Sequence, residues 1–161
     1  LIEEGLVLDA VIAQSARQRS DLWAIRDDLL EPMAQLKPRY SFDVRMGLSD
    51  MARFVEAARS SLSRTLPDAT VLFYGHGGDG NLHVTVGTQG ADGGEVLAND
   101  AVYAATRDVG GSISAEHGVG RYKKPYLGFT RSPAEIALMC AIKTALDPAD
   151  ILNPGKVVPG A

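Results

Sequence analysis

The sequence predicts an α+β fold in which a mostly antiparallel sheet has helices packed on one face. Segments with helical and with strand periodicity alternate along the 161 residues. Two strand segments, residues 70–74 and 82–87, are separated only by a short glycine-rich stretch, which is typical of a hairpin. A hairpin requires antiparallel pairing, so a purely parallel, doubly wound sheet is excluded.

The N-terminal half has the patterns of two helices and one strand. Asp9 is a candidate cap for a first helix, which continues to Pro32 and has apolar residues at helical spacing: Leu22, Ile25 and Leu29. Residues 39–46 alternate between apolar and polar side chains, as a half-buried strand does. Ser49 is a candidate cap for a second helix, whose apolar stripe is Met51, Val55, Ala58 and Leu62.

The C-terminal half continues with the hairpin and a third helix over residues 95–109, which ends at two glycines suited to a left-handed cap. Residues 112–115 are expected to form a short strand that leads into a glycine-rich loop. Ser132 and Glu135, with a proline between them, form the signature of a capping box at the start of the last helix.

Composition excludes several classes of protein. The length and the hydrophobic share of 45% suit one compact domain. A net charge of −4 without a basic run argues against a nucleic-acid partner. The single cysteine, Cys140, excludes an internal disulfide and a Cys-rich zinc site. Apolar stretches are too short for a transmembrane segment, so we expect a soluble, cytoplasmic protein. The start at Leu1 suggests a cut within a longer polypeptide.

All three histidines lie in glycine-rich surroundings: His76, His83 and His117. His76 and His83 flank the turn of the predicted hairpin, so both imidazoles can meet at its mouth. Two imidazoles and one carboxylate form a three-ligand site for a divalent metal, with a position left open for substrate or water. Glu116, at the end of the short strand, is the best third ligand. The spacing matches no standard zinc motif, so turn histidines and a solvated glutamate are the alternative.

His117 follows Glu116 and can face a substrate from the same loop. A histidine that titrates near neutrality suits a general base, and a metal chelated by a 2-hydroxy acid would acidify its hydroxyl group. The alternative is a histidine satisfied by backbone groups in a tight loop. Asp79 is better interpreted as a turn former. A metal-dependent hydrolase and a non-catalytic ligand-binding module are the other function classes.

Three separated segments carry a resemblance to a known family. Residues 76–83, 112–120 and 151–156 resemble, in order and spacing, the C-terminal domain of FAD-linked oxidases, such as D-lactate dehydrogenases, the glycolate oxidase flavoprotein subunit and D-2-hydroxyglutarate dehydrogenase. The resemblance covers essentially residues 1–161 and implies a ferredoxin-like substrate domain. It implies an FAD-dependent oxidation of a D-2-hydroxy acid to the 2-oxo acid. FAD would be bound mainly by an N-terminal domain that this fragment lacks, and without it the fragment should be inactive.

The resemblance also assigns roles to the histidines. It implies that His76, His83 and Glu116 bind a divalent metal, commonly zinc, and that His117 is the base beside the flavin. Asn153 and Lys156 lie in the tail that runs toward the flavin in relatives, which makes them candidate cofactor contacts. Their alternative is a plain loop after a helix.

Two arginines are candidates for substrate binding. Arg26 matches the family arginine that binds the substrate carboxylate, although on its own it reads as an exposed helix arginine. Leu30 and Ser41 stand where relatives acting on 2-hydroxyglutarate have a threonine and a lysine, which argues against a second carboxylate. Arg45 lies on the same strand face as Ser41 and can compensate.

The partners implied are a small 2-hydroxy acid and the FAD-binding domain of the same enzyme. The resemblance leaves the electron acceptor open and is compatible with a homodimer. Lys123 and Lys124 are interpreted as part of a solvated loop.

Overall fold

The computed structural model describes residues 4–5, 8–28 and 30–158, without the side chains of residues 26 and 30–32. The chain divides into two units, Leu1–Gln35 and Leu36–Ala161, and each is described by itself. The first unit contains α1 (Ala16–Asp27) and α2 (Leu30–Gln35).

The first helix begins later than the sequence predicts. Residues 9–14 are not helical, and the Asp9 carboxylate accepts the N–H of Ala10 at 2.8 Å. The N–H of Gln18 instead donates to Ser15 Oγ at 3.2 Å, so Ser15 caps α1 and the assignment of the cap to Asp9 is wrong. Leu29 lies outside the described residues.

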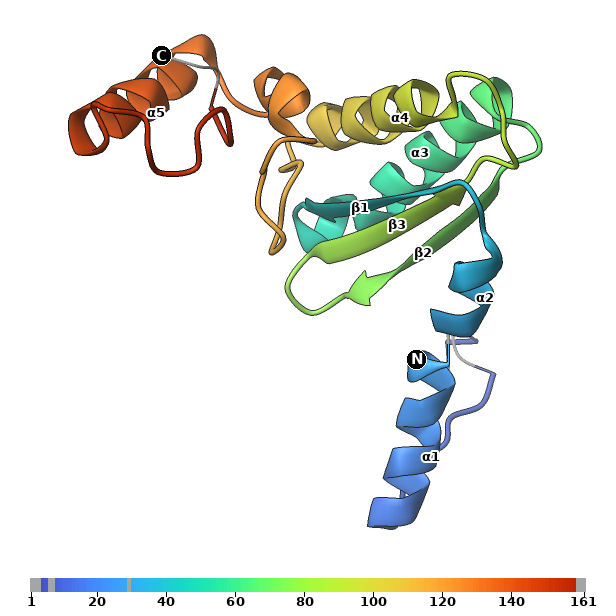
Figure 1. Cartoon of the computed structure of the whole chain (residues 1–161). Coiled ribbons are helices and arrows are strands. Elements are labelled where there is room, and N and C mark those ends of the chain that lie inside the picture. The colour runs from blue at the N-terminus through green and yellow to red at the C-terminus, as the bar shows by residue number, and fades with distance from the viewer. Residues whose placement is uncertain (1–3, 6–7, 29, 159–161) are drawn as a thin grey trace. The chain divides into compact units, whose positions relative to one another are not determined.

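The second unit holds a three-stranded antiparallel sheet of β1 (Arg39–Arg45), β2 (Thr70–His76) and β3 (Asn81–Gly87), in the order β1-β3-β2. Helices α3 (Met51–Thr65) and α4 (Gly94–Asp108) cover one face of this sheet (Figure 1). The predicted α+β fold and its hairpin are therefore confirmed.

The element order strand, helix, strand, strand, helix is that of a ferredoxin-like fold. Where a fourth strand would pair with β1, Ser112 makes an isolated antiparallel bridge to Arg45. The expected strand over residues 112–115 is therefore reduced to one pair, because the glycines before it and the loop after it leave little extended chain.

The core lies between the two helices and the covered face of the sheet. Its largest fully buried side chains include Phe54 and Leu62 of α3. Of the predicted apolar stripe, Ala58 and Leu62 are buried and Met51 and Val55 are half-buried, whereas Phe54 was not predicted. The strands supply five further buried apolar residues: Phe42, Val44, Leu82, Val84 and Val86. Tyr40 of β1 also packs against this core, and strand alternation sends the odd-numbered side chains of β1 and β3 to the opposite face.

The helix ends test the predicted caps. Asp50 occupies the N-cap position of α3, and Ser49 lies inside a short 3₁₀ helix, Leu48–Asp50, so the Ser49 cap is wrong. The capping box of α5 (Pro133–Leu146) is confirmed, because Ser132 Oγ accepts the N–H of Glu135 at 3.2 Å and Glu135 Oε2 accepts the N–H of Ser132 at 2.7 Å. A 3₁₀ helix at Lys124–Phe129 was not predicted.

Within the described part of the chain, no helix has the length and apolar character needed to cross a bilayer.

Candidate functional site

The sheet face opposite the helices carries polar side chains. Phe42 and Val44 of β1 point into the core, so Asp43 between them points away from it. In the strand register, Asp43 lies opposite His83, and His83 lies opposite Tyr74. The rings of Tyr74 and His83 are 5.3 Å apart. These three residues form a row across the open face.

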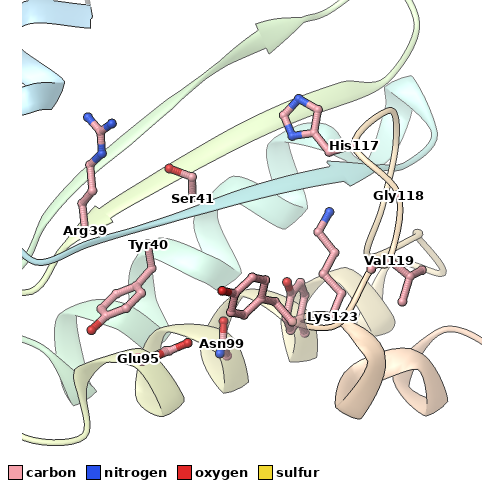
Figure 2. A pocket seen from close by; sticks show the side chains of 12 residues that line it. Arg39, Tyr40, Ser41, Glu95, Asn99, His117, Gly118, Val119 and Lys123 are labelled. Carbon is pink, nitrogen blue, oxygen red and sulfur yellow. The ribbon is translucent and has the colours of Figure 1, made fainter. Parts of the chain in front are cut away.

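Two close backbone contacts fix the loops at the end of β1. Ser112 and Arg45 exchange backbone hydrogen bonds of 3.0 and 2.7 Å, and a Cβ on Gly111 would lie 2.7 Å from the Arg45 carbonyl oxygen. In the hairpin turn, Gly80 has a φ of +77°, and a Cβ there would lie 2.1 Å from the Met46 carbonyl oxygen. Glycine is therefore required at both positions. Figure 2 shows the loop that follows the Ser112 bridge lying beside β1.

The Glu116 carboxylate is the point on which the histidines converge. Its Oε1 lies 3.1 Å from His83 Nε2, 3.8 Å from His117 Nε2 and 3.9 Å from His76 Nε2. Asn81 Nδ2 donates to the same oxygen at 3.0 Å. The ring of His83 is stacked on that of His117 at 5.4 Å. The hairpin and the loop thus bring together the four residues that the sequence singled out.

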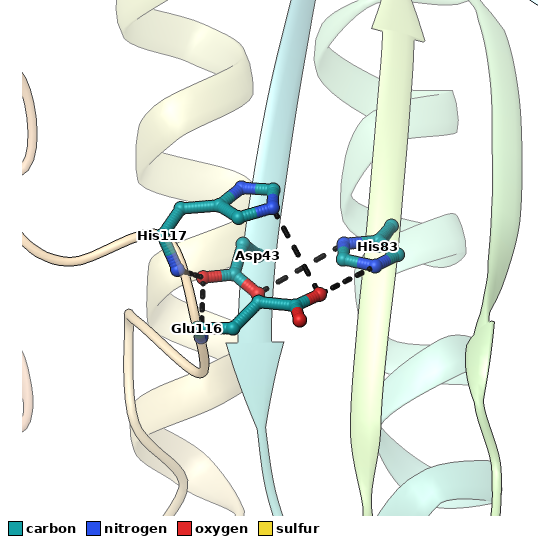
Figure 3. A group of neighbouring side chains, drawn as sticks. All are labelled: Asp43, His83, Glu116 and His117. Atoms are coloured by element: carbon teal, nitrogen blue, oxygen red, sulfur yellow. Dashed lines mark hydrogen bonds and ion pairs between the residues drawn. The ribbon is translucent and has the colours of Figure 1, made fainter.

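Asp43 is a part of the site that the sequence did not predict. Its Oδ2 accepts the backbone N–H groups of Ala115, Glu116 and His117 at 3.0, 3.0 and 2.9 Å, and Lys123 Nζ lies 3.4 Å away. Figure 3 shows Asp43 between His83 and the loop residues Glu116 and His117. The side chain of Lys123 is only 12% exposed, so its interpretation as a solvated residue is wrong. The Lys123 side chain is buried because its ammonium group pairs with the Asp43 carboxylate.

The electrostatics keep Asp43 ionised at neutral pH. Burial acts to raise the pKa of Asp43, but hydrogen bonds from the amides of His117 and Glu116, together with the nearby Lys123 ammonium, hold it below its ordinary range. Burial lowers the pKa of Lys123, although Asp43 opposes this change. The site therefore contains a buried anion that can only accept hydrogen bonds.

The donor set is of a kind that can hold a divalent metal ion. Ligand atoms from Asp43, His83, Glu116 and His117 lie within 4.8 Å of one another, and the predicted ligand His76 is not among these four. Two ligands about 2.1 Å from a tetrahedral zinc ion are about 3.4 Å apart. The Nε2–Oε1 separations from Glu116 to His83 and to His76, 3.1 and 3.9 Å, lie on either side of that value. Asp43 Oδ2 is already occupied by amides, whereas Asp43 Oδ1 has no hydrogen-bond partner within the described residues and lies 3.9 Å from His83 Nδ1.

A cavity of about 410 Å³ lies next to His117. Figure 2 shows its walls, which come from β1, from α4 and from the loop after His117. The β1 residues Arg39 and Ser41 line it, and so does Lys123. The cavity therefore presents cationic and hydroxyl groups beside the predicted base, together with the Glu95 carboxylate on the wall formed by α4.

The two arginines predicted to bind substrate lie outside this cavity lining or outside the described side chains. Arg26 belongs to α1, and its side chain lies outside the described part of the chain. Arg45 donates from Nε to the Asp79 carbonyl oxygen at 3.3 Å, at the hairpin turn. Asp79 Oδ1 accepts the N–H of Asn81 at 3.1 Å, which agrees with the turn-forming role.

The C-terminal tail returns to the loop after His117. The N–H of Val157 donates to the Gly120 carbonyl oxygen at 2.8 Å, and Lys124 Nζ donates to the Gly155 carbonyl oxygen at 2.8 Å. Lys156 Nζ donates to Asn153 Oδ1 at 3.0 Å, and both residues are exposed. The two predicted cofactor contacts therefore lie in a segment that is tied to the site loop.

Comparison with known families gives a match over nearly the whole chain. Residues 1–157 match the family model described as FAD linked oxidases, C-terminal domain.

Curated relatives match over almost the same region. A D-2-hydroxyglutarate dehydrogenase of Xanthomonas citri pv. viticola is 44% identical over 97% of this chain and 34% of its own length. That of Stutzerimonas stutzeri is 38% identical over 97% of this chain and 35% of its own length. A mitochondrial D-2-hydroxyglutarate dehydrogenase of Arabidopsis thaliana is 39% identical over 98% of this chain and 28% of its own length. The chain thus spans about a third of the length of these relatives. Because the Arabidopsis relative is named as mitochondrial, the cytoplasmic location stays a prediction.

Proposed function

The chain belongs to the C-terminal domains of FAD-linked oxidases, and we propose that it is the substrate- and metal-binding part of an FAD-dependent dehydrogenase of D-2-hydroxy acids. The observation that carries the proposal is the convergence of three histidines on Glu116 beside a cavity suited to a small acid. The relatives named as D-2-hydroxyglutarate dehydrogenases support the reaction class.

Each site residue has a proposed role in this reaction. His83, Glu116 and His76 would hold the metal, and His117 takes the proton of the substrate hydroxyl at Nε2. The bound metal would supply a Lewis acid that lowers the pKa of that hydroxyl, and FAD would supply the hydride acceptor. The stacking of His117 on His83 at 5.4 Å supports a base held beside the metal ligands. The histidine accepts a proton while the 2-hydroxy acid is oxidised to the 2-oxo acid.

The substrate carboxylates have three candidate partners. Arg26 is proposed for the carboxylate next to the reacting carbon, on the basis of the family resemblance. Arg39 and Arg45 lie at opposite ends of β1 and on the same side of its alternation as Ser41, so either can meet a second carboxylate. The cavity favours Arg39, because Arg39 and Ser41 line it together with His117.

The flavin side of the site is proposed to include Asn153 and Lys156. The hydrogen bonds of the tail to Gly120 and from Lys124 support this assignment, because they bring the tail to the loop that carries His117. The FAD-binding domain itself would come from sequence outside this chain. A homodimer and the identity of the electron acceptor stay predictions.

Metal binding is tested by zinc titration of the chelator-treated chain. We expect a single divalent ion per chain, with affinity lower by roughly 100-fold or more in His83→Ala and Glu116→Gln. His76→Ala should have a smaller effect, since His76 lies farther from Glu116 than His83 does. Asp79→Asn is the matched control, because it removes a charge from the same hairpin and keeps the oxygen that caps the turn. Unchanged affinity in both ligand variants would exclude this metal site.

The redox activity is tested in a protein that joins this chain to an FAD-binding domain. D-2-hydroxy acids should bleach the oxidised flavin, and His117→Ala should slow the bleaching by about 100- to 10,000-fold. Ester or amide turnover without flavin would favour the metal-dependent hydrolase instead. Flavin that stays oxidised with every 2-hydroxy acid, in a protein that binds FAD and metal, would favour a non-catalytic binding module.

A further inference from the structure

The last helix, α5, has two faces of different character, because side chains three and four positions apart share a face. The residues of one face are half-buried: Ile136, Met139, Cys140 and Lys143. The residues of the other face are all exposed and all apolar: Leu138, Ala141, Ile142, Ala145 and Leu146. The three large side chains of this second face, Leu138, Ile142 and Leu146, are 62, 51 and 77% exposed. The helix thus turns a charge-free apolar face to the solvent between Leu138 and Leu146.

The segment after α5 adds two exposed apolar side chains to this region. Asp147 is buried, and its two carboxylate oxygens accept the N–H groups of Ile151 and Leu152 at 3.0 and 2.9 Å. Lys143 Nζ bonds the Asp147 carboxylate and donates to the Leu152 carbonyl oxygen at 2.9 Å. These bonds hold the segment, which runs back along α5 (Figure 1). The side chains of Ile151 and Leu152 nevertheless remain exposed.

This combination of order and exposure indicates an interface. Single apolar side chains on a surface are ordinary, whereas a group of large ones marks a contact with another protein surface. The segment after α5 satisfies its polar groups internally through Asp147 and Lys143, and it leaves its apolar side chains outward. Permanent interfaces are the more apolar class, so the surface suits a partner that stays bound.

The position of this surface along the chain identifies the partner. Beyond Leu152, the tail is bonded to the loop that carries His117, through Val157 N–H to the Gly120 carbonyl oxygen at 2.8 Å. In the proposed reaction, the hydride acceptor must lie beside that loop. The acceptor, FAD, would be brought by a domain outside this chain, which spans 34 and 35% of the length of two relatives. The domain that delivers FAD to His117 therefore meets the chain on the side of this tail.

We propose that the exposed apolar face of α5, together with Ile151 and Leu152, is the docking surface for the FAD-binding domain of the same enzyme. The choice of partner rests on the proposed function, whereas the apolar surface does not. The complementary surface of that domain is apolar and uncharged. The Asp147 and Lys143 bonds hold Ile151 and Leu152 in place for this contact.

The first measurement is the rate at which a maleimide modifies Ile142→Cys. Cys140, the only native cysteine, is replaced by alanine, so that the new thiol is the one that reacts. In the isolated chain the thiol should react as an exposed group does. In the protein joined to an FAD-binding domain it should react at least about tenfold more slowly, because a covered thiol reacts only when the interface opens. Ser63→Cys, at an exposed position of α3, is the control and should react equally in both proteins.

The second measurement is the association of the two parts after a cleavable linker between them is cut. The unchanged halves should co-elute in size-exclusion chromatography. Ile142→Asp should weaken their association by roughly 100-fold, because it places an unpaired charge in an apolar interface. The isolated Ile142→Asp chain should keep its urea midpoint, since this side chain is already exposed. Ser63→Asp is the control and should leave the halves together.

The outcomes separate this proposal from the proposed function. Equal labelling of Ile142→Cys in the isolated chain and in the joined protein would overturn the docking surface. Protection that is already present in the isolated chain and disappears on dilution would assign the face to a second copy and would also overturn it. If the face is protected but no 2-hydroxy acid reduces the flavin, the docking surface stands and the proposed reaction fails. If the flavin is reduced while Ile142→Cys stays reactive, the reaction stands and the docking surface fails.

Discussion

The two faces of the sheet use alternate residues of the same strands for different purposes. On the face covered by α3 and α4, Phe42, Val44 and Val84 are almost completely buried among apolar side chains. On the open face, Asp43 and His83 meet the loop that carries Glu116. Neighbouring positions in the sequence therefore divide between packing and chemistry, because side chains in a strand alternate between its two faces.

The faces also differ in what stabilises them. The covered face depends on apolar burial, which is non-directional and proportional to area. The open face depends on directional hydrogen bonds to one carboxylate and on the buried Lys123. We therefore expect substitutions on the covered face to change stability alone, and substitutions on the open face to change ligand binding as well.

The largest stability effect is expected from Phe54→Ala on the covered face. Phe54 is fully buried and contacts Phe73 edge to face at a ring separation of 6.4 Å. Its loss should lower the free energy of unfolding by about 3–5 kcal/mol in urea titrations. Zinc affinity of the folded fraction should stay within about twofold, since distant sites act independently. Val55→Ala, a partly buried neighbour, is the control, and a large loss of zinc affinity in Phe54→Ala would contradict the separation of the faces.

A smaller stability effect is expected from Lys123→Met on the open face. Lys123 is buried against Asp43, and its removal leaves that carboxylate without its cationic partner, at a cost of about 1–3 kcal/mol. Lys124→Met is the matched control. Lys124 is half-buried and donates to a tail carbonyl rather than to a buried carboxylate, so its removal should cost roughly 0.5 kcal/mol or less. If the two variants lose the same unfolding free energy in urea titrations, the ion pair between Lys123 and Asp43 does not contribute to the stability of the chain.

The covered face was the easier one to predict from sequence. The alternation of residues 39–46 and the apolar stripe of the second helix are local patterns, and both elements are present as β1 and α3. The caps at Asp9 and Ser49 failed because several nearby serines and aspartates can each cap a helix, and the choice among them depends on where the backbone turns.

The site was predictable only in part. His76 and His83 flank one hairpin turn, so their proximity follows from local chain geometry. The bond between Asp43 and the amide of Ala115 joins residues 72 positions apart, and no local pattern indicates it. An acidic residue between two core residues of a strand is the one available signal, because it must lie on the opposite face. Lys123 was misread for the same reason, since its buried partner is distant in sequence.

Acid should weaken the open face through Asp43. Burial acts to raise the pKa of Asp43, but the amide hydrogen bonds and Lys123 hold it below its ordinary range. The stability from this shift is present above the unfolded carboxyl pKa of about 3.9 and is lost as the pH falls through the lower folded pKa. Between about pH 5 and pH 2, the metal-free chain should lose more unfolding free energy than Asp43→Asn, by at most about 1.4 kcal/mol per pH unit. Parallel pH profiles would contradict this assignment.

The smallest effect is expected at the cavity end of the open face. Arg39 is exposed and lines the cavity beside His117, with Ser41 leaving room for a substrate group between them. In the protein joined to an FAD-binding domain, Arg39→Ala should raise KM for a dicarboxylic 2-hydroxy acid about tenfold, or about 1.4 kcal/mol, and leave kcat unchanged. A monocarboxylic 2-hydroxy acid should show no change, because it has no group that reaches Arg39. Arg45→Ala serves as the comparison, since Arg45 Nε is engaged by the Asp79 carbonyl. A larger KM change in Arg45→Ala than in Arg39→Ala would assign the second carboxylate to the hairpin end of the strand. If Arg39→Ala changes KM equally for both acids, Arg39 does not act through the second carboxylate.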